Sequence, residues 1–133
     1  MSPPKHRLNK LLHYQRHNTL LNYSLLIIYA LAVTVLSLKP TVDVQNIPYN
    51  DKVAHCLTYA LFTFFAWRLS PSRSAFLINA LLVFAYSVLI EFIQPFTGRM
   101  LSGWDMVANG LGVILTVLLI TLTLHRVSFS TAN

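Results

Sequence analysis

Four long apolar runs dominate the chain and constrain what it can fold into. They cover residues 19–38, 53–69, 75–93 and 106–124, and each contains 17 to 20 residues. An α-helix rises about 1.5 Å per residue, so each run can cross a hydrocarbon core of roughly 30 Å, the shortest with help from its flanking residues. The sequence therefore predicts four transmembrane helices.

The composition excludes a water-soluble globule. Only 11% of the 133 residues are charged and 55% are hydrophobic, whereas about 25% of the residues in an ordinary soluble domain are charged. The chain also lacks the alternating ten-residue segments of a membrane β-barrel, and a backbone in lipid must satisfy its own hydrogen bonds. We therefore expect an all-α fold, an integral membrane bundle whose successive helices run antiparallel because their connections are short.

The distribution of Lys and Arg predicts the orientation of this bundle. One set of segments carries seven of them, Lys5, Arg7, Lys10, Arg16, Arg68, Arg73 and Arg126, and the opposite set carries three, Lys39, Lys52 and Arg99. Segments rich in Lys and Arg stay cytoplasmic, so both termini are expected on that side. The predicted organisation is a basic cytoplasmic segment at 1–18, a four-helix transmembrane domain at 19–124 and a short cytoplasmic tail at 125–133.

The expected location is the bacterial cytoplasmic membrane, with membrane lipids as partners. The net charge of +6 does not indicate a nucleic-acid partner, because the basic N-terminal residues serve as a topological signal and attract anionic headgroups. The first run follows basic residues, as in a secretory signal, but it continues unbroken to Leu38, which favours an uncleaved helix. Cys56 is the only cysteine and is expected to be a small buried hydrophobe, without a disulfide or a cysteine-based zinc site.

All four acidic residues, Asp43, Asp51, Glu91 and Asp105, fall on the side opposite the termini. Glu91 lies in the last turn of its predicted helix and Lys52 in the first turn of another. The helix dipole disfavours a charge of that sign at each place. Pairing of Glu91 with Lys52 or Arg99 would remove this conflict.

Structural explanations compete with functional ones. Asp51 or Asn50 can cap a helix, and the S-x-x-D spacing of Ser102 and Asp105 is that of a capping box. Glu91 can form a buried ion pair that only locks helices together. However, an ionisable group costs about 2.5 to 3.5 kcal/mol at the membrane centre and less near the interface, and such groups usually mark functional sites.

Helical spacing predicts that the polar residues converge. Residues three or four apart share one helix face, and three such stripes run inward from the outer side. Pro95 is expected to end the third helix, while Gly98 and Gly103 let Arg99 fold back over the stripes. The pattern predicts a cavity open to the outside and closed towards the cytoplasm. The stripes are His55, Tyr59 and Thr63; Ser87, Glu91 and Gln94; and Asp105, Asn109, Gly112 and Thr116.

We assign candidate roles by chemistry. His55, with Asp51 one turn before it and carboxylates on other helices, suits a general base, and His55, Glu91 and Asp105 are the candidate catalytic residues. A metal held by these three is disfavoured, because no pair has the tight spacing of a metal motif and cations lie near. No cofactor is expected. The candidate ligand-binding residues are Asp51, Lys52, Tyr59, Gln94, Arg99 and Asn109.

The ordered set Asp51-Lys52-x-x-His55-x-x-x-Tyr59, Glu91-x-x-Gln94, Gly98-Arg99 and Asp105-x-x-x-Asn109, with Gly110 and Gly112 behind it, resembles the VanZ-like membrane proteins. The resemblance spans residues 51–112, about half of the chain. It implies a small helical membrane protein. Some members are associated with reduced susceptibility to teicoplanin-type glycopeptides, by a mechanism that is not settled. Cys56 departs from the family, which commonly has a bulky apolar residue there, and this bears on packing.

Four functions follow as hypotheses. The first is a pocket that binds a polar or anionic cell-envelope component, such as a lipid headgroup, through Lys52 and Arg99. The second is an enzyme acting on such a lipid with His55 as general base. A proton-coupled carrier ranks lower, because its acid belongs near the midplane, and a purely structural bundle ranks last. The spacing of Ala108 and Gly112 permits close helix contact and also a homo-oligomer.

Overall fold

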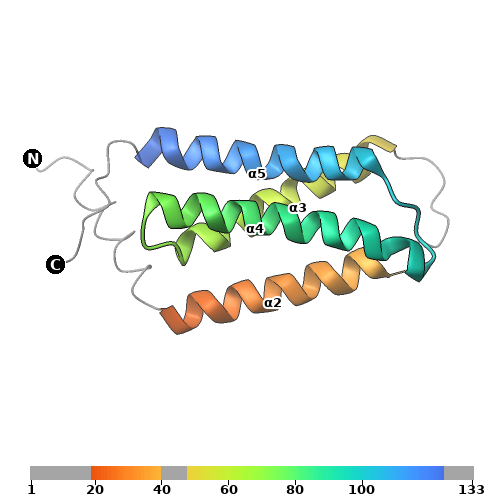
Figure 1. The fold of residues 1–133 in the computed structure, drawn as a ribbon, viewed down its shortest axis with the longest axis horizontal. Coiled ribbons are helices and arrows are strands. Elements are labelled where there is room, and N and C mark those ends of the chain that lie inside the picture. The colour runs from red at the N-terminus through yellow and green to blue at the C-terminus, as the bar shows by residue number, and fades with distance from the viewer. Residues whose placement is uncertain (1–18, 40–47, 125–133) are drawn as a thin grey trace, which may run out of the picture.

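The computed structural model describes residues 19–39 and 48–124, and within them every regular element is a helix. The elements in chain order are α2 (Thr19–Leu38), α3 (Pro48–Arg68), α4 (Arg73–Ile93), the short 3₁₀ helix η1 (Gln94–Thr97) and α5 (Gly103–Leu124). Figure 1 shows the four α-helices side by side along one axis. The predicted all-α class is therefore confirmed.

The central helix of the bundle is α3. It contacts the other three helices and packs most closely against α5. Helices α2 and α5 lie on opposite sides of the pair formed by α3 and α4 (Figure 1). The beginnings of α3 and α5 and the ends of α2 and α4 therefore meet at one end of the bundle, which we call the cluster end.

Helix α3 begins five residues before the apolar run that predicted it. Proline suits a first helical turn, where its missing N–H is not needed, and α3 begins at Pro48 and includes Asp51 in its first turn. The expectation that Asn50 or Asp51 caps this helix is therefore wrong, because the helix starts before both. The charged first turn places Asp51 and Lys52 on a regular helix, one turn before His55.

Local signals explain the boundaries of α4. Ser72 precedes the helix, and its hydroxyl oxygen accepts a hydrogen bond from the Ala75 N–H at 3.2 Å. The helix ends at Ile93, two residues before Pro95, as predicted, and η1 follows. Gly98 then adopts φ 83°, a left-handed conformation that glycine tolerates best. This turn directs the chain towards Arg99 and α5.

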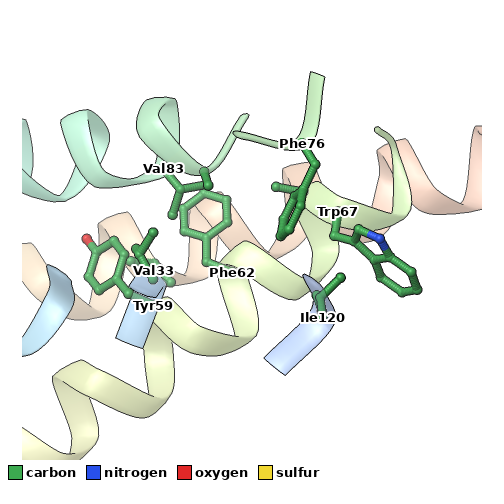
Figure 2. Packing of buried hydrophobic residues seen from close by; sticks show 10 residues of the cluster. Val33, Tyr59, Phe62, Trp67, Phe76, Val83 and Ile120 are labelled. Atoms are coloured by element: carbon green, nitrogen blue, oxygen red, sulfur yellow. The ribbon is translucent and has the colours of Figure 1, made fainter. Parts of the chain in front are cut away.

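Aromatic packing forms the core between α2, α3 and α4. The Phe62 ring contacts Tyr29 at 5.6 Å and Tyr86 at 5.4 Å between centroids, both edge to face, which is a favoured geometry for aromatic pairs. Phe76 and Val83 of α4 and Trp67 of α3 extend this cluster (Figure 2). The core occupies the middle of the bundle and the half away from the cluster end.

The outer surface is apolar on all four helices. Three of them are long and apolar enough to cross a membrane, over Thr19–Leu38, Arg73–Thr97 and Gly103–Thr123. Unpaired apolar surface of this extent belongs in lipid. The chain is therefore a multi-pass membrane protein.

The contact of α3 with α5 depends on Gly112. A Cβ atom at this position would overlap the carbonyl oxygen of Cys56 and lie 3.0 Å from the Ala60 nitrogen. Four residues further along α5, the Thr116 hydroxyl donates to the Ala60 carbonyl at 3.1 Å. Cys56 itself is only partly buried. The absence of a side chain at Gly112 thus sets how closely α5 approaches the α3 backbone.

Candidate functional site

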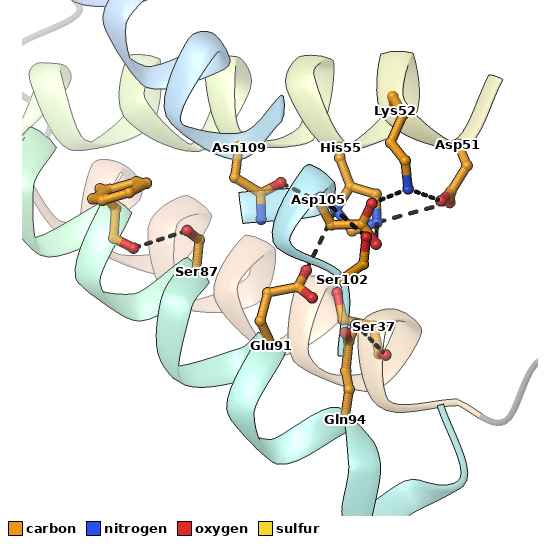
Figure 3. Close-up of polar contacts among 11 residues, drawn as sticks. Ser37, Asp51, Lys52, His55, Ser87, Glu91, Gln94, Ser102, Asp105 and Asn109 are labelled. Carbon is orange, nitrogen blue, oxygen red and sulfur yellow. Dashed lines mark hydrogen bonds and ion pairs between the residues drawn. The ribbon is translucent and has the colours of Figure 1, made fainter. Parts of the chain in front are cut away.

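The three polar stripes turn towards the interior of the bundle. Their members on α3, α4 and α5 are buried, with only His55 partly exposed. Six residues at the cluster end approach one another, and we call them the polar cluster (Figure 3). They are Asp51, Lys52, His55, Glu91, Asp105 and Asn109.

His55 lies at the centre of the polar cluster. Its Nδ1 atom is 3.0 Å from Asn109 Oδ1 and 4.0 Å from Glu91 Oε1. Its Nε2 atom is 3.5 Å from Asp105 Oδ2 and 3.7 Å from Asp51 Oδ1. One imidazole on α3 therefore faces α4 and α5 at the same time. This geometry suits a group that holds or transfers a proton, or that binds a ligand between the helices.

Lys52 joins the two aspartates from the other side. Its ammonium lies 3.1 Å from Asp51 Oδ2 and forms an ion pair with Asp105 Oδ1. Lys52 is thus paired with these acids and not with Glu91, which was one of the two pairings that the sequence suggested for Glu91. Glu91 Oε1 instead lies 4.0 Å from His55 Nδ1. Lys52 precedes the apolar part of α3.

Asp105 is held by the start of α5. The Ser102 hydroxyl oxygen accepts a hydrogen bond from the Asp105 N–H at 3.3 Å, which is one half of a capping box. The carboxylate of Asp105, only 5% exposed, turns to Lys52 and His55. The cap therefore uses the backbone of Asp105 and leaves its side chain for the cluster.

The deeper hydroxyls of the stripes have ordinary partners. Thr63 and Ser87 donate to backbone carbonyls of their own helices, and Thr116 donates across to α3. Nearer the cluster end, four buried polar atoms have no hydrogen-bond partner among the residues that the structure describes, namely Tyr59 Oη, Glu91 Oε2, Gln94 Oε1 and Asn109 Nδ2. An unpaired buried polar atom costs about 1 to 3 kcal/mol, and native proteins contain few of them. These four atoms could bind a ligand or ordered water.

A cavity of about 250 Å³ opens between α2 and α3 beside the polar cluster. Its polar lining consists of Asp51, His55, Tyr59 and Arg99. Its apolar lining comes from α2 and includes Val33 and Leu36. The left-handed Gly98 permits Arg99 to return here, and the Arg99 N–H donates to the Gln94 carbonyl at 3.1 Å. The cavity is therefore polar at one end and apolar along one side.

The structure separates the predicted site residues into groups. Six of them form the polar cluster, and two others, Arg99 and Tyr59, border the cavity. The six are Asp51, Lys52, His55, Glu91, Asp105 and Asn109. Gln94 turns to α2, where its Nε2 donates to the Ser37 carbonyl at 3.2 Å. The contribution of α2, through Ser37, Tyr29 and its apolar wall, was missed, because this helix carries no charge that would mark it in the sequence.

Comparison with known proteins gives one result. A model of the VanZ/LLP1 family matches residues 7–124, a range that contains all four α-helices and the whole polar cluster. Neither a search of curated proteins nor a search of solved structures returned a match. The match covers most of the chain, and the chain therefore belongs to the VanZ/LLP1 family.

Proposed function

We propose that this protein is a four-span protein of the bacterial cytoplasmic membrane that binds the anionic headgroup of a cell-envelope lipid at the outer face. The cavity beside the polar cluster is the observation that carries this proposal. An amphiphilic ligand needs a polar pocket that continues into apolar surface, and this cavity joins Arg99, His55 and Asp51 to the apolar wall of α2.

The proposal requires α3 to span the membrane as well. Its 21 residues give a length of about 31 Å at about 1.5 Å per residue. Its exposed apolar side chains, Val53, Leu57, Leu61 and Phe64, follow one face along the helix. The opposite face carries His55, Tyr59 and Thr63, which lowers the average apolarity of α3 without exposing these polar groups to lipid. The excess of Lys and Arg on the other side supports an outward-facing cluster end.

Arg99 is the cation best placed for the headgroup. Lys52 is already held by two carboxylates, whereas Arg99 borders the cavity, and guanidinium binds phosphate or carboxylate through two parallel hydrogen bonds. Asp51 and His55, at the same end of the cavity, suit hydroxyl or amine groups of the headgroup. The lipid tail would follow Val33 and Leu36 towards the membrane interior.

Native mass spectrometry of the protein extracted with its lipids tests this proposal. The wild type should retain lipids of one headgroup class, and Arg99→Ala should lose them. Arg73→Ala is the matched control, because Arg73 is an exposed arginine at the opposite end of the bundle. Equal retention in wild type and Arg99→Ala, or equal loss in both variants, would refute the role of this cavity.

An enzyme is the second candidate, and the surroundings of His55 favour it. Asn109 and Glu91 fix the Nδ1 side of His55, as the partner of a general base fixes its ring, and His55 also lines the cavity. In vesicles that contain the co-purified lipid, an enzyme should convert it, and His55→Gln should abolish conversion while lipid retention persists. Absence of conversion by the wild type would exclude this candidate. A carrier is less compatible, since the acids of the cluster lie near the starts of α3 and α5 and the end of α4, away from the middle of the bundle.

The link to glycopeptides is a further part of this proposal. If the protein occupies or shields an envelope lipid, its expression in a susceptible strain should lower susceptibility to teicoplanin-type compounds. Arg99→Ala should lose this effect, and Arg73→Ala should keep it. An effect that is unchanged in Arg99→Ala would separate the phenotype from the cavity.

A further inference from the structure

The hydrogen bonding of His55 determines which nitrogen is available to a ligand. Asn109 Oδ1 lies 3.0 Å from Nδ1, and Glu91 Oε1 lies 4.0 Å from the same atom. Asn109 Oδ1 is an acceptor, so the Nδ1–H donates to it. The other ring nitrogen, Nε2, is then the atom that a cation can bind, in exchange for any proton on it.

Nε2 faces two carboxylate oxygens. Nε2 lies 3.5 Å from Asp105 Oδ2 and 3.7 Å from Asp51 Oδ1, both longer than a good N–H···O hydrogen bond. Donor atoms from all three side chains lie within 4.8 Å of one another. At zinc bond lengths of about 2.0 to 2.2 Å, adjacent ligands of a tetrahedral ion lie about 3.4 Å apart. The two distances from Nε2, 3.5 and 3.7 Å, are close to this value.

Lys52 does not occupy the space between these ligands. It binds Oδ2 of Asp51 and Oδ1 of Asp105, whereas the other oxygen of each carboxylate faces His55. From the sequence, a metal was disfavoured partly because cationic side chains such as Lys52 lie near the candidate ligands. In the structure this lysine instead turns one oxygen of each aspartate towards Nε2.

Glu91 is a third carboxylate that faces this cluster, and it comes from α4 (Figure 3). Its side chain is 1% exposed, and among the residues that the structure describes its Oε2 atom has no hydrogen-bond partner. A carboxylate behind the Nδ1–H of a histidine also makes its other nitrogen a stronger metal ligand.

We infer that Asp51, His55 and Asp105 form a binding site for a divalent first-row transition-metal cation such as Zn²⁺ or Mn²⁺. One imidazole nitrogen and two carboxylate oxygens suit these ions better than they suit Ca²⁺, which prefers oxygen ligands alone. Asp51 is 47% exposed, so the ion can enter from the cluster end and keep a coordination position for water or a ligand oxygen. This inference goes beyond lipid binding and does not rest on it.

Calorimetry with Zn²⁺ alone tests the site on the purified full chain in detergent. The parent protein for this experiment carries Gln in place of His6, His13, His17 and His125, so that His55 is the only histidine. It should bind one Zn²⁺ per chain, and His55→Gln should weaken binding by at least about 100-fold, because a ligand is lost. Binding of equal affinity in the parent and in His55→Gln, or no binding by the parent, would overturn the inference.

Asn109 is a positioning residue, and its variants give a second test. Asn109→Ala should lower Zn²⁺ affinity by about 10-fold, and Asn109→Asp should restore it, because a carboxylate also accepts from Nδ1–H. Circular dichroism checks that each variant is folded. Visible absorption of bound Co²⁺ reports the ligands directly and should disappear in His55→Gln. A spectrum that His55→Gln leaves unchanged would place the ion elsewhere.

The two proposals can fail separately. If headgroup retention depends on Arg99 but the parent binds no Zn²⁺, the lipid proposal stands and the metal inference is wrong. If Zn²⁺ binds through His55 while Arg99→Ala retains all lipids, the reverse holds.

Discussion

Gly112→Ala is expected to disrupt the packing of α5 against α3. The added methyl would overlap the Cys56 carbonyl oxygen and lie 3.0 Å from the Ala60 nitrogen, where ordinary contacts begin at 3.4 Å. Both obstacles are backbone atoms, so no rotamer change relieves them. The two helices must separate, and the hydrogen bond from Thr116 to the Ala60 carbonyl lengthens with them.

The magnitude follows from a matched pair of glycines on the same helix. At Gly110 a Cβ would lie 3.1 Å from the Phe84 ring, a side chain that can shift by a few tenths of an ångström. Both alanine substitutions gain about 1 kcal/mol of helix propensity. Overpacking usually costs about 1 to 3 kcal/mol. We expect a clash with backbone atoms to cost about 3 kcal/mol or more, because backbone atoms cannot move aside as a side chain can. Gly112→Ala should therefore be less stable than Gly110→Ala by at least about 2 kcal/mol.

Unfolding in mixed micelles, followed by circular dichroism, measures this difference. The separation should also lengthen the 3.0 Å contact between His55 and Asn109, which bridges the same two helices. Zn²⁺ affinity should then fall in Gly112→Ala and persist in Gly110→Ala. Equal stability of the two variants would refute the close approach of α5 to the α3 backbone.

Three further substitutions test other parts of the structure. Ser102→Ala should lower the unfolding free energy by about 1 kcal/mol, because the Asp105 N–H loses its cap, and an unchanged value would contradict the cap. Tyr86→Phe should lower the unfolding free energy by about 1 kcal/mol, because the Tyr86 hydroxyl donates to the Ala30 carbonyl and joins α4 to α2. Hydrogen exchange in α2 should become faster in this variant. Glu91→Gln should change the unfolding free energy by less than about 1 kcal/mol or raise it. The substitution removes a buried carboxylate whose Oε2 atom has no hydrogen-bond partner among the described residues. A loss above about 3 kcal/mol would identify a structural ion pair.

The helices could be predicted where apolarity and helix length coincide. α2 matches the first apolar run from Thr19 to Leu38, and α4 ends at Ile93, before Pro95. α3 begins at Pro48, earlier than its apolar run, because a helix can continue through charged residues once it leaves the membrane interior. Hydropathy marks the apolar part of such a helix and does not mark its polar first turn.

The pairing of charges could not be predicted from spacing alone. Periodicity places Glu91, His55 and Asp105 on the inner faces of three helices, and the structure agrees in burying these faces. The rotation and depth of one helix against another depend on contacts such as that of Gly112 with the Cys56 carbonyl. They decide that Lys52 meets Asp105 instead of Glu91.

The orientation of the cluster end is the central claim, since an outer-leaflet ligand requires it. Two single-cysteine proteins test it in a Cys56→Ala background. The first is Gly103→Cys, where no atom of the described residues lies within 4 Å of an added Cβ, and the second is Ser74→Cys, at an exposed position in the first turn of α4. A membrane-impermeant maleimide added to intact cells should label Gly103→Cys at once and Ser74→Cys only after permeabilisation. Labelling of both from the same side, or only of Ser74→Cys in intact cells, would contradict the account.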